Sequence, residues 1–114
     1  MTRDEEFMKL AIEEAKKSKG PKKFGAVVVK DGEVVAKAYS TTEEEQDGTR
    51  HAEIKAISEA CKVLGTKHLP GCILYSTCEP CMMCTGAAMW EKIRKIVYGM
   101  NRQDALRHFE HSNH

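Results

Sequence analysis

Two strand-like segments separated by a short helical segment constrain the fold of this chain most strongly. GCILYST at residues 71–77 and IRKIVYG at residues 93–99 both have the composition of strands. Residues 80–92 between them begin with a proline and predict a helix. A strand–helix–strand unit of this length is typical of a crossover that joins parallel strands. The chain should therefore place a helix against one face of a sheet.

The first part of the chain predicts a helix followed by a β-hairpin. Residues 4–19 place apolar side chains at three- and four-residue intervals, with acids early, lysines late and Gly20-Pro21 at the end. The next segments, GAVVVK and EVVAKAY, are rich in valine and are joined by Asp31-Gly32. An Asp-Gly pair between two such runs is a strong signal for a tight hairpin.

Residues 51–65, HAEIKAISEACKVLG, follow a polar loop and predict a second helix. Its larger apolar residues share one helical stripe: Ile54, Ile57, Cys61 and Leu64. The order of elements is then α-β-β-α-β-α-β. We expect an α/β fold, a three-layer α/β/α sandwich whose mixed four- or five-stranded sheet has helices on both faces. The 114 residues suit one domain, residues 1–114.

Three of the five cysteines, Cys78, Cys81 and Cys84, lie close together, which is typical of a metal site. Cys81 and Cys84 are three residues apart where a helix begins, so both thiolates can face one ion, and His51 can supply a third ligand. Three protein ligands leave a position for water, as in catalytic zinc sites. We expect one Zn²⁺ per chain, and we favour Cys78 as a strand-end residue behind the metal over Cys78 as a further ligand.

Glu53 lies two residues after His51, so a rotation of about 200° about the helix separates the two side chains. We therefore expect Glu53 to be a catalytic residue and not a ligand. Zinc lowers the pKa of a bound water to around 7, and a neighbouring carboxylate can remove a proton from that water and later return it. Glu79 has two equally weighted roles, accepting a hydrogen bond from a substrate amine or stabilising a helix N-terminus.

These motifs resemble the signature of the zinc-dependent cytidine deaminase-like superfamily, which is defined by histidine-x-glutamate and a later proline-cysteine-x-x-cysteine. The resemblance covers residues 5–109 and includes the order of elements. FGAVVVKDGEVVAKA, HAEIKAI, LYSTCEPCMMCTGAAMW and VYGMNRQDA are most similar to the bacterial guanine deaminases, a group close to the tRNA adenosine deaminases. The resemblance implies a cytidine deaminase-like fold and a hydrolase acting on cyclic amidines, which deaminates a nucleobase or nucleoside and releases ammonia.

The resemblance also implies substrate contacts. Phe24 and Trp90 would line the base pocket, although as residue types both would otherwise be core aromatics. Ser40 occupies the place of an asparagine that contacts the base, and Ala52 would offer its backbone N–H to the substrate. Ser40 lacks the paired donor and acceptor of asparagine, which departs from the pattern of the group.

Two further segments depart from the group. Asp47-Gly48-Thr49-Arg50 stands where the group has Asp-Pro-Thr-Ala, which loosens a turn and brings a cation near the metal. LRHFEHSNH follows Asp104-Ala105, where guanine deaminases have an acidic segment that reaches a partner subunit and closes the pocket. The second departure weakens guanine in particular as the substrate.

Several functions remain open from the sequence. A guanine-like free base is the first choice, and the alternatives are adenosine in a tRNA anticodon loop (A-to-I), cytosine or cytidine, and, less expected, a non-catalytic zinc-folded binding module. In the tRNA case the lysines of residues 16–23, with Lys92, Arg94 and Lys95, would contact phosphates. A net charge of +1 and the absence of asparagine at position 40 place nucleic acid second as a partner.

The resemblance implies a homodimer as well. The N-terminus MTRDEEFMKL has neither the basic start nor the apolar stretch of an export signal. No apolar run approaches the roughly 20 residues that cross a bilayer. We therefore expect a cytoplasmic protein without membrane association.

Overall fold

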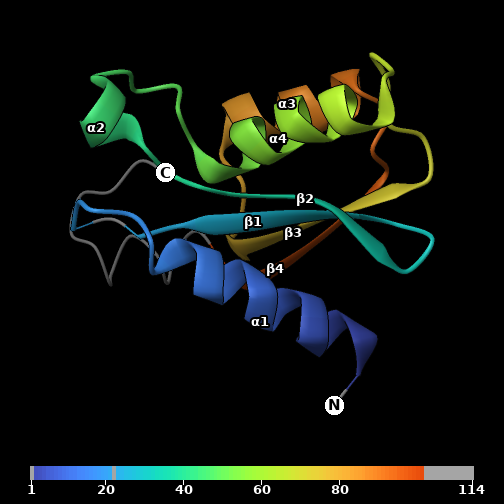
Figure 1. Cartoon of the computed structure of the whole chain (residues 1–114), viewed down its shortest axis with the longest axis horizontal. Coiled ribbons are helices and arrows are strands. Elements are labelled where there is room, and N and C mark those ends of the chain that lie inside the picture. Colours follow the sequence, from blue (N-terminus) through green and yellow to red (C-terminus); the bar gives the residue numbers. More distant parts are fainter. Residues whose placement is uncertain (1, 22, 102–114) are drawn as a thin grey trace.

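The computed structural model describes residues 2–21 and 23–101; the expected departure after Asp104 lies outside these residues. The chain forms an α/β sandwich (Figure 1). Its elements are α1 (Arg3–Ala15), β1 (Gly25–Lys30), β2 (Glu33–Tyr39), α2 (Thr42–Glu45), α3 (Ala52–Leu64), β3 (Cys72–Cys78), α4 (Met82–Trp90) and β4 (Lys95–Met100). The order matches the predicted one, except that the polar loop before α3 contains the single-turn helix α2.

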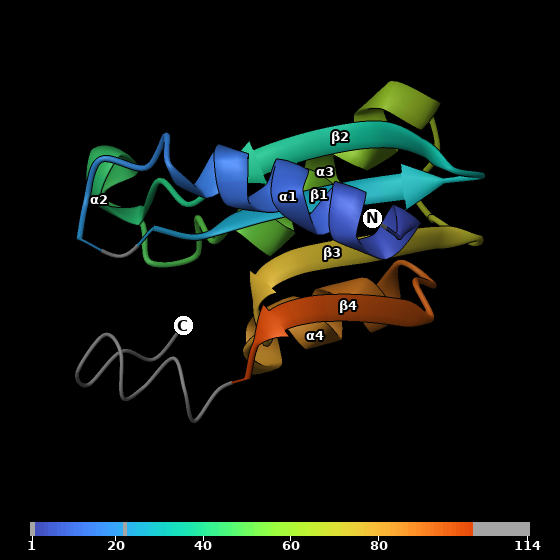
Figure 2. The ribbon, with the colours of Figure 1, turned by 90° about the horizontal axis from the view of Figure 1, so that it is seen from below.

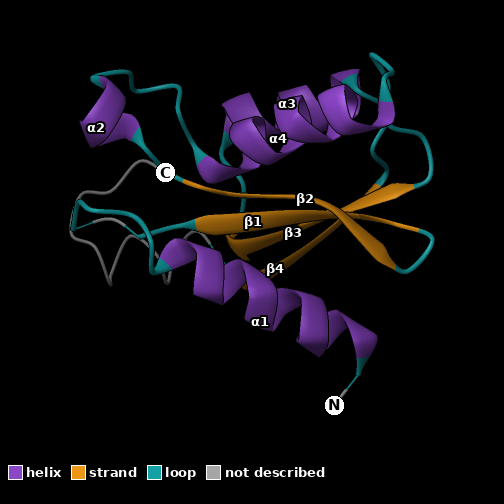
Figure 3. Cartoon of the chain, in the orientation of Figure 1, coloured by secondary structure: helices purple, strands orange, loops and turns teal. Residues whose placement is uncertain are grey.

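The sheet has the strand order β2-β1-β3-β4 in the described part of the chain. Strand β1 pairs antiparallel with β2 and β3, and β3 pairs parallel with β4 across the α4 crossover. Helix α1 covers one face of the sheet, while α3 and α4 cover the other (Figure 3). Seen from below, α1 lies across β1 and β3, and β2 and β4 form the two edges (Figure 2). The predicted three-layer sandwich with a mixed sheet is confirmed.

The hairpin between β1 and β2 turns at Asp31-Gly32, as predicted. Both residues have left-handed backbone angles, with φ of 52° and 79°, and Lys30 pairs with Glu33 across the turn. Two consecutive left-handed residues form a tight turn whose twist suits paired strands, and aspartate and glycine are the residues that adopt it at least cost.

Helix α1 starts as predicted but ends four residues early. The Thr2 hydroxyl accepts a hydrogen bond from the Glu5 N–H at 3.1 Å, which closes a capping box. The helix stops at Ala15, so the lysines that follow lie outside its last turn. Ser18 is buried, and its hydroxyl donates to the Ser40 carbonyl at 2.7 Å. This contact across 22 residues draws the chain out of the helix before Gly20-Pro21.

Helix α3 packs on the sheet mainly through alanines, and Ile57 is the one residue of the predicted stripe that is buried. Ala52, Ala56 and Ala60 recur every four residues and are buried, together with Ile57. Small side chains let the helix backbone approach the sheet closely. Of the predicted stripe, Ile54 and Cys61 are half-buried and Leu64 is exposed.

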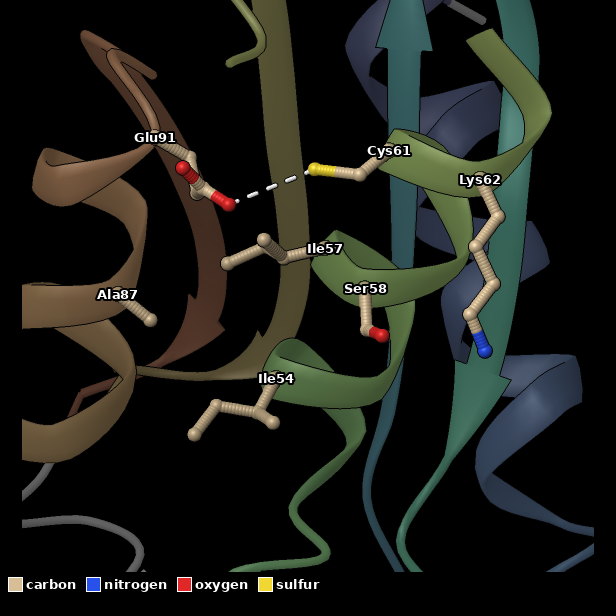
Figure 4. Close-up of a pocket in the computed structure, with 7 residues that line it drawn as sticks. All are labelled: Ile54, Ile57, Ser58, Cys61, Lys62, Ala87 and Glu91. Carbon is tan, nitrogen blue, oxygen red and sulfur yellow. Dashed lines mark hydrogen bonds between the residues drawn. The ribbon is translucent and has the colours of Figure 1, made fainter. Parts of the chain in front are cut away.

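A groove of about 420 Å³ separates α3 from the end of α4 (Figure 4). The groove is lined by Ile54, Ile57, Ser58, Cys61, Lys62, Ala87 and Glu91. The Cys61 thiol donates to Glu91 Oε2 at 3.5 Å across it. Burial and this carboxylate raise the pKa of Cys61, so the thiol stays protonated and joins the two helices. No described helix is both long enough and apolar enough to cross a membrane.

Candidate metal centre and active site

The two helices that carry the predicted ligands begin at the same end of the sheet. His51 caps the N-terminus of α3 and Cys81 caps that of α4, each with an extended backbone. The side chain of a residue in this position turns back over the first helical turn. Cys84, the third residue of α4, therefore faces Cys81.

Helix α4 begins at Met82, two residues after the predicted start at Pro80. The pairing of β3 with β4 continues to Cys78 and Met100, and the Glu79 N–H donates to the Met100 carbonyl at 2.6 Å. These contacts keep the chain extended through Glu79, which delays the helix. The prediction that proline opens the helix is therefore wrong, whereas the convergence of the two cysteines does not depend on it.

The structure brings His51, Cys81 and Cys84 together. Their donor atoms all lie within 4.8 Å of one another, and His51 Nδ1 is 3.6 Å from Sγ of Cys81 and 3.6 Å from Sγ of Cys84. In a tetrahedral zinc site, Zn–N and Zn–S bonds of about 2.0 and 2.3 Å separate nitrogen from sulfur by about 3.5 Å. The donor spacing thus fits zinc.

The raised pKa of the Cys84 thiol also indicates that a cation binds here. Cys84 is fully buried, and this burial raises the pKa of its thiol well above the usual range, with further contributions from Glu53 and Cys81. A thiolate at this position therefore needs a positive charge beside it. A divalent metal supplies that charge and displaces the thiol proton.

Glu53 is the second residue of α3 and is 0% exposed. Its effect on the pKa of Cys84 shows that the carboxylate lies near the donor cluster. Within the described residues, that cluster consists of His51, Cys81 and Cys84 and does not include Glu53. Ala52, the first residue of α3, is buried, and an N–H in this position has no acceptor within its own helix.

Ser40 and Phe24 lie next to the first turn of α3. The Ser40 N–H donates to the Phe24 carbonyl at 3.0 Å, and the Thr41 N–H donates to the carbonyl of Arg50, which precedes His51, also at 3.0 Å. Phe24 is buried in the same core cluster as Ala52. The hydroxyls of Ser40 and Ser18 lie 3.0 Å apart, a contact that no local sequence pattern indicates.

Trp90 lies far from the metal donors of its own chain. It is the last residue of α4 and is 79% exposed, and nine residues of helix place it roughly 13 Å along the axis from Cys81. Its surroundings are a hollow lined by Lys67, His68, Gly86, Met89 and Lys92. The structure therefore does not bring Trp90 into the site of the same chain.

The remaining predicted residues lie between β3 and α4 or in the loop before α3. Cys78 is buried at the end of β3 among core residues and is not part of the donor cluster, and Cys72 is likewise buried in the core. Glu79 is half-buried, and both of its roles stay predictions. The Asp47 carboxylate holds the loop at residues 47–50, which departs from the pattern of the group. It accepts hydrogen bonds from the Thr49 N–H at 2.9 Å and from the Thr49 hydroxyl at 2.7 Å. It also forms an ion pair with Arg50 at 3.6 Å.

The chain is similar to deaminases that act on tRNA and on guanine. It is 50% identical over 101 residues to the tRNA-specific adenosine deaminase of Bacillus subtilis, covering 87% of this chain and 63% of that protein. It is 48% identical over 82 residues to the guanine deaminase of the same organism, covering 72% of this chain and 53% of that protein. The chain thus spans less than two thirds of the length of these relatives.

The fold is shared as well. The X-ray structure of guanine deaminase from Bacillus subtilis superimposes with a TM-score of 0.84 at 42% identity, covering 91% of this chain and 68% of that chain. Residues 1–100 match the family described as the cytidine and deoxycytidylate deaminase zinc-binding region. The predicted His-Cys-Cys zinc site is that of the family, and the chain belongs to the cytidine and deoxycytidylate deaminase zinc-binding family.

Proposed function

We propose that this chain is a single zinc-dependent deaminase domain that replaces the amino group of adenosine in tRNA with oxygen and releases ammonia. The observation that carries the proposal is the meeting of three metal donors with the buried carboxylate of Glu53 at the first turns of α3 and α4. A structural zinc site has no use for such a carboxylate beside three ligands. This arrangement argues against the non-catalytic binding module.

His51, Cys81 and Cys84 would hold the zinc. When bound, the metal lowers the pKa of a coordinated water to around 7, which provides a nucleophile at neutral pH. Glu53 accepts a proton from the attacking water and passes it to a ring nitrogen of the base. The same carboxylate then helps to protonate the amino group, which leaves as ammonia while the ring carbon keeps the oxygen.

Burial suits Glu53 to this role. A carboxylate held away from bulk water passes its proton to the substrate and does not exchange it freely with solvent. The backbone N–H of Ala52, at the first turn of α3, and the hydroxyl of Ser40 would contact the base. Phe24 would form an apolar wall behind them.

Similarity to known proteins favours adenosine in tRNA over guanine as the substrate, although the sequence patterns alone placed guanine first. The match to the tRNA enzyme is longer and more identical than the match to the guanine enzyme. Guanine stays the second candidate because the guanine deaminase structure superimposes over 91% of the chain.

Exposed cations lie where an RNA backbone would approach. Lys16 and Lys19 are exposed in the loop between α1 and β1, at the end of the sheet where α3 and α4 begin (Figure 1). Binding of RNA phosphates by such side chains releases counterions, so RNA affinity should fall steeply as salt is raised. Binding of a neutral free base should change little with salt.

The test is ammonia release by the zinc-loaded protein from a panel of substrates. The panel contains a tRNA anticodon stem-loop, guanine, adenine, cytosine and their nucleosides, with Glu53→Ala as the blank. We expect release from the stem-loop, lost in the variant, with a KM that rises with salt. Release from guanine alone would instead establish the second candidate, and silence across the panel with one zinc per chain would overturn the deaminase proposal.

A further inference from the structure

The loop that leads into the metal ligand His51 has little packing of its own. Residues 43–49 are all exposed, and the loop projects with α2 beyond the end of the sheet (Figure 1). A Cβ placed on Gly48 would meet nothing within 4 Å in the described part of the chain, so the tip of the loop is not packed against a neighbour. The loop is therefore held through its two ends and through polar contacts.

The helix that follows the loop lacks the usual side-chain cap. A residue in the position of His51 commonly accepts a hydrogen bond from an N–H of the first helical turn. The His51 imidazole faces the sulfurs of Cys81 and Cys84 instead, and it does not cap α3. The extended backbone of His51, with φ of −71° and ψ of 152°, therefore needs another source of support.

Lys55 provides this support through a closed ring of contacts. The Lys55 N–H donates to the His51 carbonyl at 3.1 Å, and the Lys55 ammonium donates to the Thr41 hydroxyl at 2.8 Å. The Thr41 N–H in turn donates at 3.0 Å to the carbonyl of Arg50, the residue before His51. The ring begins and ends at His51, and it ties the entry of the loop to its exit.

The ammonium of Lys55 has further partners that hold it in the ring. It lies 3.6 Å from Glu45 Oε2 and 5.4 Å from the centre of the Tyr39 ring, and the Thr41 hydroxyl donates to the same Glu45 oxygen. The hydrogen bond from Thr41 lowers the pKa of Glu45, and Lys55 adds to this shift, so the carboxylate keeps its charge at neutral pH. The Lys55 side chain is only 26% exposed, which reduces the screening of these contacts by salt.

We propose that Lys55 is a positioning residue for the metal centre, which fixes the backbone of His51 and so aims the imidazole at the zinc. Groups that orient a metal ligand typically change metal affinity by 10- to 100-fold when they are removed. A ligand that follows an exposed loop depends on such a group more than one within a packed helix does. The effect on zinc does not involve the substrate, and only a resulting loss of turnover rests on the proposed function.

Lys55→Met tests the proposal without any substrate. Methionine has a helix propensity similar to that of lysine but no ammonium. Competition with a chelating dye should show a zinc affinity about tenfold lower than that of wild type, and circular dichroism checks that the variant is folded. Loss of a cation alone would favour zinc binding. An unchanged or higher zinc affinity in folded Lys55→Met would therefore overturn the proposal.

The matched control is Lys62→Met. Lys62 lies two turns farther along the same face of α3 and is exposed, so the same substitution there should leave zinc affinity unchanged. An equal loss of affinity in Lys62→Met would show that any lysine of this face has the same effect, and the role given to Lys55 would be wrong.

Thr41→Val breaks the same ring from its other side. Valine has nearly the shape of threonine but lacks the hydroxyl, so zinc affinity should fall to a similar extent. The double variant with Lys55→Met should bind zinc little more weakly than either single variant, because both substitutions interrupt one ring. Losses that add in full would show that the two residues act independently, which contradicts the ring.

Cobalt in place of zinc shows which ligand moves. At saturating Co²⁺, the sulfur-to-cobalt charge-transfer band reports the thiolates, and the d–d bands report the whole coordination geometry. Lys55→Met should keep the charge-transfer band and change the d–d bands, because the imidazole shifts while the thiolates stay bound. Unchanged d–d bands, or loss of the charge-transfer band, would overturn the positioning role. The expected changes in a protein that releases no ammonia would support the role of Lys55 and overturn the proposed function alone.

Discussion

The two faces of the sheet bury different sets of side chains. The face under α1 is filled by large apolar side chains: Phe7, Val27, Val29 and Tyr75, together with Ala11. The rings of Phe7 and Tyr75 pack in a tilted arrangement, with their centroids 5.2 Å apart. The face under α3 and α4 also buries large apolar side chains, such as Phe24 and Leu74, and adds to them alanines, the thiols of Cys78 and Cys84, and the buried carboxylate of Glu53.

This difference confines the groups that bind metal and move protons to one face of the sheet. Large apolar groups contribute roughly 1.5–3 kcal/mol each when buried, whereas a buried carboxylate or thiolate costs free energy unless a cation or hydrogen bonds compensate it. The α1 face should therefore stabilise the fold through packing, whereas the opposite face should stabilise it through packing and, in addition, through bound metal. Substitutions on the two faces should then have different consequences, which the following experiments measure.

The largest effect is expected at the metal donors. Cys84→Ala removes a ligand, so the purified variant should contain no zinc, and added zinc should no longer raise its melting temperature. Zinc analysis and thermal melts with and without the metal measure this. Cys72→Ala is the matched control, because Cys72 is also a buried thiol but lies outside the donor cluster. Full zinc occupancy in Cys84→Ala would contradict the assignment.

Glu53→Gln should separate metal binding from turnover. The amide has nearly the shape of the carboxylate but cannot take up the proton, so turnover should fall by about 10²- to 10⁴-fold while the zinc content stays at one per chain. Its unfolding free energy should not fall, because a buried charge has been removed. Single-turnover rates, zinc analysis and urea unfolding measure the three quantities. Unchanged turnover would rule out the role given to Glu53.

Local signals in the sequence predicted the parts of the structure that depend on neighbouring residues. Asp31-Gly32 indicated the hairpin, and the spacing of Cys81 and Cys84 indicated the metal site. Contacts between distant residues could not be predicted in this way. Ser18 and Ser40 bond across 22 residues and end α1 early, and the pairing of β3 with β4 delays the start of α4.

The difference between the expected and the observed position of Trp90 has another cause. The expected helix already separated Trp90 from Cys81 by nine residues, or roughly 13 Å. The resemblance nevertheless assigned both residues to one site, because a motif records residue types and their spacing and not the distances between them in the fold. The distance along α4 is therefore what keeps Trp90 away from the donor cluster of its own chain.

On the α1 face, Gly25→Ala should act on stability alone. A Cβ at this position would overlap the Ala11 carbonyl and come within 2.6 Å of the Ala15 backbone nitrogen, so α1 must move away from the sheet. We expect a loss of about 3 kcal/mol in unfolding free energy, typical of a severe overpacking substitution. Urea unfolding measures the loss, and zinc analysis of the folded protein serves as the control. Loss of zinc at full stability would contradict the separation of the two faces.

Tyr75→Phe should have the smallest effect, and this effect should depend on pH. The buried Tyr75 hydroxyl donates to Asp4 Oδ1 at 2.5 Å, and burial, together with this carboxylate, raises the pKa of the phenol from 10.0 to about 12. Between these values the unfolded chain loses the phenolic proton while the folded chain keeps it, so stability is present below pH 10 and falls as the pH rises towards 12.

The variant lacks both the hydrogen bond and the titrating group. It should be about 1 kcal/mol less stable than wild type at pH 7, with unchanged zinc content, and the difference should shrink as the pH rises above 10. Parallel urea titrations of the two proteins across this range measure the difference. A difference that stayed constant with pH would show that the Asp4 contact does not control the phenol. Stability on the α1 face would then come from packing alone.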